Sequence, residues 1–168
     1  MKNKYLFIIT MLVTCNVMAT ESLQTLTAPI ASEQDQLNYI SAPIKSLDNL
    51  YTYNSTTPKI NNPIERLTPS GKTRFINSLE FSKTGLGSYS YTDLVNELSA
   101  SEIYQILSLF GVQHSISKAN LKITNDSDRK VVKALSSGAS LQADRRDYWC
   151  GSPGTCHPRR WYICTQNC

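Results

Sequence analysis

The stretch Ser99–Gly111, with the sequence SASEIYQILSLFG, contains the clearest structural signal in the chain. Ser99 and Glu102 have the spacing of a capping box, in which each side chain accepts a hydrogen bond from the other residue's backbone at the start of a helix. Gly111 suits the left-handed conformation that ends many helices. Between them, apolar residues are spaced i, i+3, i+4 and i+7: Ile103, Ile106, Leu107 and Phe110. We therefore predict an amphipathic helix with one face in a core.

Shorter helices are predicted on both sides of this one, over Pro69–Leu79, Thr92–Leu98 and Asp128–Ser136. The pair Thr68-Pro69 is typical of a helix start, with proline at the first helical position. Alternating apolar residues also fit a strand over 74–81, so helix and strand both remain open there. At 168 residues the chain has the length of one domain. We expect a mainly α protein, with residues 64–144 forming a small α or α+β domain.

The N-terminus has the pattern of a secretory signal peptide over residues 1–19. Lys2 and Lys4 precede the apolar run Tyr5–Val13, and Ala19 is the small residue expected before a cleavage site. The run is too short to cross a bilayer as a helix, so no transmembrane span is expected in the mature chain. A lipid on Cys15 is the alternative for this segment. We therefore predict a secreted or periplasmic protein.

Residues 20–63 are expected to be a flexible, disordered N-terminal arm. Polar clusters fill this segment, and prolines interrupt it, which disfavours long regular elements. A short helix between Ser32 and Ile40 is compatible with the pattern. The prolines concerned are Pro29, Pro43, Pro58 and Pro63.

The net charge of the chain is modest and concentrated at its C-terminal end. The formal charge of +4 falls to +2 once Lys2 and Lys4 leave with the signal peptide. That is too small to favour a nucleic-acid partner, because nucleic-acid-binding domains usually carry a strongly basic face. Residues 145–168 hold one acidic side chain, Asp147, against four basic ones: Arg145, Arg146, Arg159 and Arg160.

The same segment contains every cysteine of the expected mature chain: Cys150, Cys156, Cys164 and Cys168. In an exported protein an even set of cysteines predicts disulfides, here two, and three pairings are possible. A zinc site is the alternative, but the spacing lacks the C-x2-C pair of most structural zinc sites. We expect neither a metal nor another cofactor.

Residues 145–168 are therefore predicted to be a Cys-rich basic-aromatic module, a hairpin or loop stapled by disulfides. Tryptophan, tyrosine and arginine are the residue types most enriched at binding hot spots. We expect the module to bind a protein, a glycan or an anionic surface. The aromatic side chains could equally serve only to pack the module against the helices. The candidate binding residues are Tyr148, Trp149, Arg159, Arg160, Trp161 and Tyr162.

Two other functions remain open from the sequence. The dibasic pair Arg145-Arg146 could be a processing site, and residues 147–168 would then be released as a secreted peptide or toxin. A secreted hydrolase ranks third, because no catalytic set can be assigned. The chain has no serine in a G-x-S-x-G context. Its two histidines, His114 and His157, lie in different regions.

Overall fold

The fold is α+β. It is seen in a computed structural model that describes residues 36–137 and 144–168. The expected signal peptide with Ala19, and the first part of the expected arm, lie outside these residues. The α-helices are a short one over 36–41, α2 (Leu47–Thr56), α3 (Pro69–Asn77), α4 (Thr92–Glu97), α5 (Ala100–Ser108) and α6 (Asp126–Ser137). Three 3-10 helices cover Lys59–Asn61, Pro63–Arg66 and Ser115–Lys118. The strands are β1 (Glu80–Ser82), β2 (Gly85–Ser90), β3 (Arg145–Ser152) and β4 (Thr155–Cys164).

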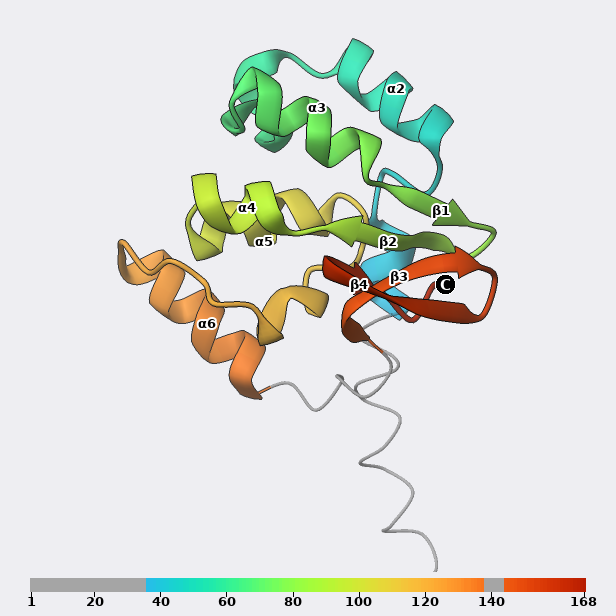
Figure 1. The fold of residues 1–168 in the computed structure, drawn as a ribbon. Coiled ribbons are helices and arrows are strands. Elements are labelled where there is room, and N and C mark those ends of the chain that lie inside the picture. The colour runs from blue at the N-terminus through green and yellow to red at the C-terminus, as the bar shows by residue number, and fades with distance from the viewer. Residues whose placement is uncertain (1–35, 138–143) are drawn as a thin grey trace, which may run out of the picture.

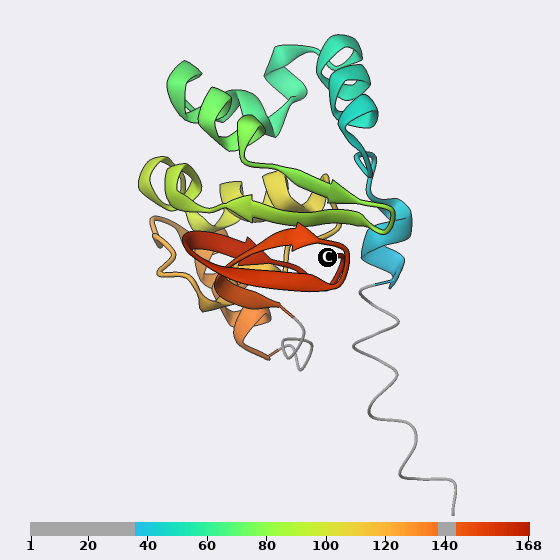
Figure 2. The ribbon, with the colours of Figure 1, turned by 45° about the vertical axis from the view of Figure 1, so that its right-hand side comes forward.

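The four strands form one antiparallel sheet in the order β1-β2-β4-β3, so the last strand of the chain lies inside the sheet. Figure 1 shows α2 and α3 at the top, α4 and α5 at the level of the sheet and α6 at the lower left. The 45° turn in Figure 2 shows the helix over 36–41 beside the loop that joins β1 to β2. Between helices and sheet, Phe75 makes edge-on contacts with Tyr89 and Phe110 at centroid distances of 6.4 and 6.2 Å.

The predicted helix over Ser99–Gly111 is confirmed as α5. Glu102 accepts a hydrogen bond from the backbone N–H of Ser99 at 2.9 Å, as the capping box requires. Gly111 has a φ of +72°, the left-handed conformation expected after the helix. The four residues of the apolar stripe are all fully buried: Ile103, Ile106, Leu107 and Phe110.

The buried carboxylate of Asp128 joins the start of α6 to the start of α5. It accepts hydrogen bonds from the backbone N–H of Ser101 at 2.8 Å and of Thr124 at 2.7 Å. Burial by itself would raise the pKa of Asp128, but the hydrogen bonds from Ser101 and Thr124 outweigh it and hold the pKa well below the usual range. One side chain thus satisfies backbone donors of two helix N-termini.

The expectation of a mainly α fold with a small α or α+β domain is confirmed only in part, because the helices share the fold with a four-stranded antiparallel sheet. The segment 74–81, for which helix and strand were both open, contains the end of one and the start of the other. The helix α3 ends at Asn77 and the strand β1 begins at Glu80. The sequence of β2, GLGSYS, contains two glycines, which are depleted in strands, yet its first five residues are buried. Gly87 allows a close approach here, since a Cβ at this position would lie 3.2 Å from the Cys150 sulfur, a tight contact.

The expectation of a flexible arm over 20–63 is wrong for its second half. Ile44 and Leu50 are fully buried, and the Ile44 N–H donates to the Leu109 carbonyl at 3.0 Å. Among the described residues, Pro58 and Pro63 do not prevent helices because they lie at helix boundaries. Pro58 directly precedes the first 3-10 helix, and Pro63 is the first residue of the second.

The C-terminal segment 145–168 is not a module separate from 64–144, contrary to the predicted boundary. β4 pairs with β2 in the register Ser88↔Cys164, Tyr89↔Ile163 and Ser90↔Tyr162. Ile163 is buried in the same core as the helices. The hairpin made by β3 and β4 therefore rests on the helical part of the protein.

Candidate binding surface on the C-terminal hairpin

The β3–β4 hairpin is sharply bent in its middle. Arg146 pairs with Ile163, but the next pair is Tyr148 with Pro158, so Asp147 alone lies opposite residues 159–162. The bend places the Cα atoms of Cys156 and Cys164 only 6.0 Å apart. Eight residues of straight strand would span about 26 Å. The tip of the hairpin therefore folds back over its base.

Two disulfides hold the folded-back tip, Cys150–Cys168 and Cys156–Cys164. This confirms that these four cysteines form disulfides and selects one of the three possible pairings. Among the described residues, one group of three potential metal ligands comes close together, Cys150, Cys164 and Cys168. Because all three sulfurs are in disulfide bonds, they are not available as thiolate ligands.

Asp147 and Trp161 form the inside of the bend. Both have left-handed backbones, with φ of +62° and +68°. Asp147 Oδ1 accepts hydrogen bonds from the Trp161 N–H at 2.9 Å and from the Tyr91 hydroxyl at 3.0 Å. The Trp161 N–H bond is the main reason that the pKa of Asp147 is lowered. Burial raises the pKa of Tyr91, which also accepts a hydrogen bond from Arg146 Nε at 3.1 Å.

Four flat side chains make a continuous row on one face of the hairpin tip. The Trp149 and His157 rings, a cross-strand pair, have centroids 6.3 Å apart. The Arg159 guanidinium lies 5.3 Å from the Trp149 ring centroid and 4.0 Å from that of Tyr162. We call His157, Trp149, Arg159 and Tyr162 the tip row. Gly151 leaves the space that His157 uses, since a Cβ there would lie 2.5 Å from the imidazole.

A second row crosses the bend. Arg160 lies over Trp161 at 5.8 Å, Trp161 contacts the Tyr91 ring edge-on at 5.8 Å, and Arg146 lies over Tyr91 at 5.6 Å. We call these four residues the bend row. Trp161 remains 47% exposed, so one large ring of this row faces solvent. Next to it, Arg145 lies over the Tyr148 ring at 5.9 Å.

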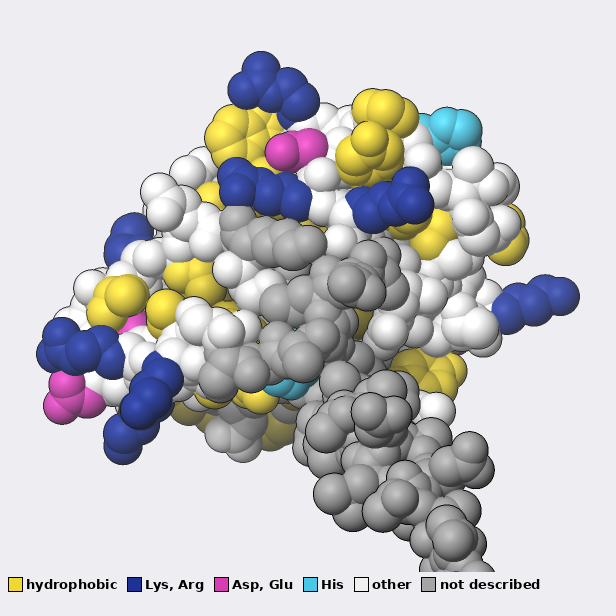
Figure 3. Space-filling model, turned by 90° about the horizontal axis from the view of Figure 1, so that it is seen from below, with side chains coloured by type: hydrophobic (Ala, Val, Ile, Leu, Met, Phe, Trp, Pro, Cys, Tyr) yellow, Lys and Arg dark blue, Asp and Glu magenta, His cyan; other side chains and the backbone are white. Residues whose placement is uncertain are grey.

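Three of these arginines keep their hydrogen-bond donors available. Within the described part of the chain, the guanidinium groups of Arg145, Arg159 and Arg160 donate no hydrogen bond. Each guanidinium lies over an aromatic ring, at 4.0 to 5.9 Å from its centroid, and carries its N–H donors at its edges. A guanidinium edge binds carboxylate, sulfate or phosphate oxygens in pairs. Viewed from below in Figure 3, basic side chains lie beside hydrophobic ones along the upper edge of the molecule.

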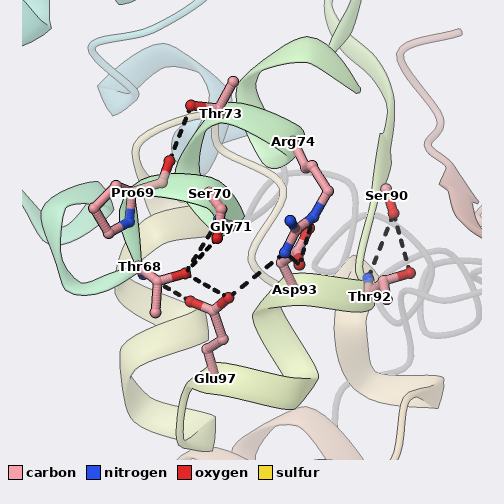
Figure 4. A network of polar contacts seen from close by, with 10 residues as sticks. All are labelled: Thr68, Pro69, Ser70, Gly71, Thr73, Arg74, Ser90, Thr92, Asp93 and Glu97. Carbon is pink, nitrogen blue, oxygen red and sulfur yellow. Dashed lines mark hydrogen bonds and ion pairs between the residues drawn. The ribbon is translucent and has the colours of Figure 1, made fainter.

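A polar cluster lies next to the tip row, between α3 and α4. Arg74 donates hydrogen bonds to the Asp93 carboxylate from Nε at 3.1 Å and from Nη2 at 2.6 Å. Glu97 accepts from the Thr68 backbone at 2.7 Å and from its hydroxyl at 2.9 Å. Figure 4 shows both carboxylates of α4 directed at α3. These contacts join the two helices and leave much of the Arg74 side chain exposed.

The six predicted binding residues are brought together, although not in one row. Trp149, Arg159 and Tyr162 belong to the tip row, and Arg160 and Trp161 belong to the bend row. Tyr148 contacts only Arg145 among the aromatic and basic residues of the hairpin. The sequence reasoning missed three contributors, Tyr91, Arg146 and His157. The predicted processing pair Arg145-Arg146 lies in β3, where Arg146 is bonded to Tyr91.

Comparisons with family models, curated proteins and solved structures find no match for the chain. In the described residues no helix combines the length and apolarity that crossing a membrane requires.

Proposed function

We propose that this chain is an exported, non-enzymatic binding protein. Its hairpin surface, made of the tip row and the bend row, holds an anionic target outside the cytoplasm, in the extracellular space or the cell envelope. The observation that carries the proposal is the set of three arginines stacked on aromatic rings with their donor edges open. Stacking limits the rotamers of these long side chains, so less conformational entropy is lost when a ligand binds.

Export is supported by two independent features. Residues 1–19 have the basic start, apolar run and small residue of a secretory signal. The two disulfides suit an oxidising compartment, since such bonds are rare in the cytosol. A binding surface whose shape depends on disulfides would then be used where those disulfides persist.

The surface composition favours an anionic target over an apolar one. Trp149 and Tyr162 are half-buried, and their exposed area is shared with Arg159. Asp147, the one acidic residue of the hairpin, is engaged by Trp161 and Tyr91. Cationic edges that alternate with rings match a ligand that carries repeated negative groups.

Release of residues 147–168 as a peptide has no comparable support. It would remove β4 from its place next to β2 and uncover Tyr89, which is fully buried. It would also divide the β3–β4 pairing at its base. We therefore place the function in the intact chain.

The proposal is tested by chromatography on immobilised heparin, a sulfated polyanion. The variant Arg159→Ala with Arg160→Ala is compared with Lys130→Ala with Lys133→Ala, which removes the same charge from the exposed face of α6. Charge-assisted hydrogen bonds are worth about 1.5–3 kcal/mol each, so we expect at least a tenfold loss of affinity for the arginine variant only. Equal elution of both variants at the same salt concentration would overturn the proposal.

A further inference from the structure

A shallow groove of about 370 Å³ lies beside the tip row. Tyr162 lines it on the hairpin side, and polar residues of α3, α4 and the end of β2 line the remainder, including Arg74, Asn77, Thr92 and Asp93. Ligand pockets usually occupy about 300–1,000 Å³, so this groove has room for a small group rather than a folded partner. Tyr162 is therefore shared between the tip row and the groove.

The groove presents donors and acceptors in close alternation. Arg74 engages Asp93 through Nε and Nη2, which leaves Nη1 with no hydrogen bond to a described residue. The exposed Asn77 amide likewise has no hydrogen-bond partner in the described part of the chain. Thr92 Oγ1 accepts from Ser90 Oγ at 3.3 Å and can still donate its own proton. Sugar hydroxyls both donate and accept hydrogen bonds, so they can pair with this mixture of donors and acceptors.

The charge of the groove differs between its two ends. At the α3–α4 end, Asp93 neutralises Arg74 in a pair with an N–O distance of 2.6 Å. Arg159 does not line the groove but lies next to its hairpin end, where its guanidinium is 4.0 Å from the Tyr162 ring centroid and is bonded to no acid among the described residues. A ligand that fits both ends has hydroxyls on one side of a ring and an acidic group on the other.

We propose that this groove is the subsite for one acidic sugar unit of the anionic target. The sugar ring packs against Tyr162, its hydroxyls bond Asn77, Thr92 and the Arg74–Asp93 pair, and its carboxylate or sulfate binds the Arg159 edge. This inference rests on the proposed function, because it names the chemical class of the target. An acidic peptide would use Arg159 but would leave the polar end of the groove unmatched.

Titration calorimetry of the full chain tests the subsite with three probes: trigalacturonate, the neutral sugar maltotriose and triglutamate. Asn77→Ala and Thr92→Val remove groove groups, whereas Asn96→Ala is the matched control on an exposed position of α4 outside the groove. Each lost hydrogen bond should weaken trigalacturonate binding about three- to tenfold. We expect no effect of these variants on triglutamate, no effect of Asn96→Ala on any probe, and weaker binding of maltotriose than of trigalacturonate.

The inference is overturned if Asn77→Ala and Thr92→Val both bind trigalacturonate as tightly as the native chain. It is also overturned if triglutamate binds the native chain as tightly as trigalacturonate does. Failure of the subsite is distinguishable from failure of the proposed function. A native chain that binds heparin through Arg159 but not trigalacturonate retains the function and loses the subsite, whereas a chain that binds neither loses both.

Discussion

At the scale of single residues, the proposed binding surface depends on Asp147. A left-handed backbone is tolerable for aspartate but strained for a bulky residue such as Trp161, at a cost of about 1–3 kcal/mol. The hydrogen bond from the Trp161 N–H to Asp147 Oδ1, at 2.9 Å, offsets part of that strain. Asp147 thereby positions both arginines that precede Trp161 in β4.

Asp147→Ala should weaken the bend more than Asp147→Asn does. Alanine removes the acceptor and disfavours the positive φ, whereas asparagine keeps an oxygen acceptor and tolerates the left-handed region. We expect Asp147→Ala to cost about 1–3 kcal/mol of unfolding free energy, measured by chemical denaturation, and to lower heparin affinity. Asp147→Asn should stay close to the native chain in both measurements. Equal behaviour of the two variants would contradict this role.

The same residue predicts a dependence of stability on pH. The pKa of Asp147 is lowered in the folded protein, chiefly by the Trp161 N–H bond, and that of Asp128 is lowered as well. Their stabilising contribution is therefore complete above the unfolded pKa of about 3.9 and is lost as pH falls through the folded values. The thermal unfolding midpoint should decrease as the pH is lowered below about 4. For Asp147→Asn, the midpoint should decrease less steeply with pH than for the native chain. Identical slopes of the thermal midpoint against pH for the two proteins would show that folding does not lower the pKa of Asp147.

At the scale of elements, the disulfides keep the hairpin tip folded back on its base. Cys150 and Cys168 are 18 residues apart, and closing a loop of that length contributes about 3 kcal/mol in the chain-entropy model. Both are only half-buried, which makes this pair more suitable for replacement than the pair with the buried Cys164. The tip row is carried by the segment that this bond holds.

Cys150→Ser with Cys168→Ser should therefore lower stability by about 2–4 kcal/mol and weaken heparin binding together. The weaker binding follows because Trp149 and Arg159 regain conformers that the ligand must then restrict. Denaturant unfolding and heparin affinity measure the two effects on one sample. Loss of stability with native affinity would show that the folded-back tip is not needed for binding.

The elements also show which parts of the fold local sequence can predict. The helix α5 is predictable because the Ser99–Glu102 box and its apolar stripe are signals within one segment. The strand β2 is not, because its glycines carry no strand signal and its partner β4 follows more than 60 residues later. In the hairpin, by contrast, the sequence shows which aromatic and arginine residues are present. Tyr91 joins them only through β2–β4 pairing and a bend with two positive-φ residues.

At the scale of the whole molecule, the proposed binding surface is supported from behind by the core. Tyr89 and Ile163 are paired across β2 and β4, and both are buried with the helices α3 and α5. Tyr89 also hydrogen-bonds Ser115 through its hydroxyl at 2.7 Å. The hairpin is thus held by the strand β2 and by the helices that share its core. A preorganised surface of this kind loses little entropy on binding.

In the proposed function, stacked arginine edges rather than net positive charge bind the target. The most direct measurement is the heparin affinity of Arg159→Lys beside that of Arg129→Lys, an exposed arginine on α6 paired with Asp126. Lysine keeps the charge but lacks the planar fork that lies between Trp149 and Tyr162. We predict about a tenfold loss for Arg159→Lys, corresponding to about 1.4 kcal/mol, and native affinity for Arg129→Lys. Native affinity for Arg159→Lys would contradict the claim.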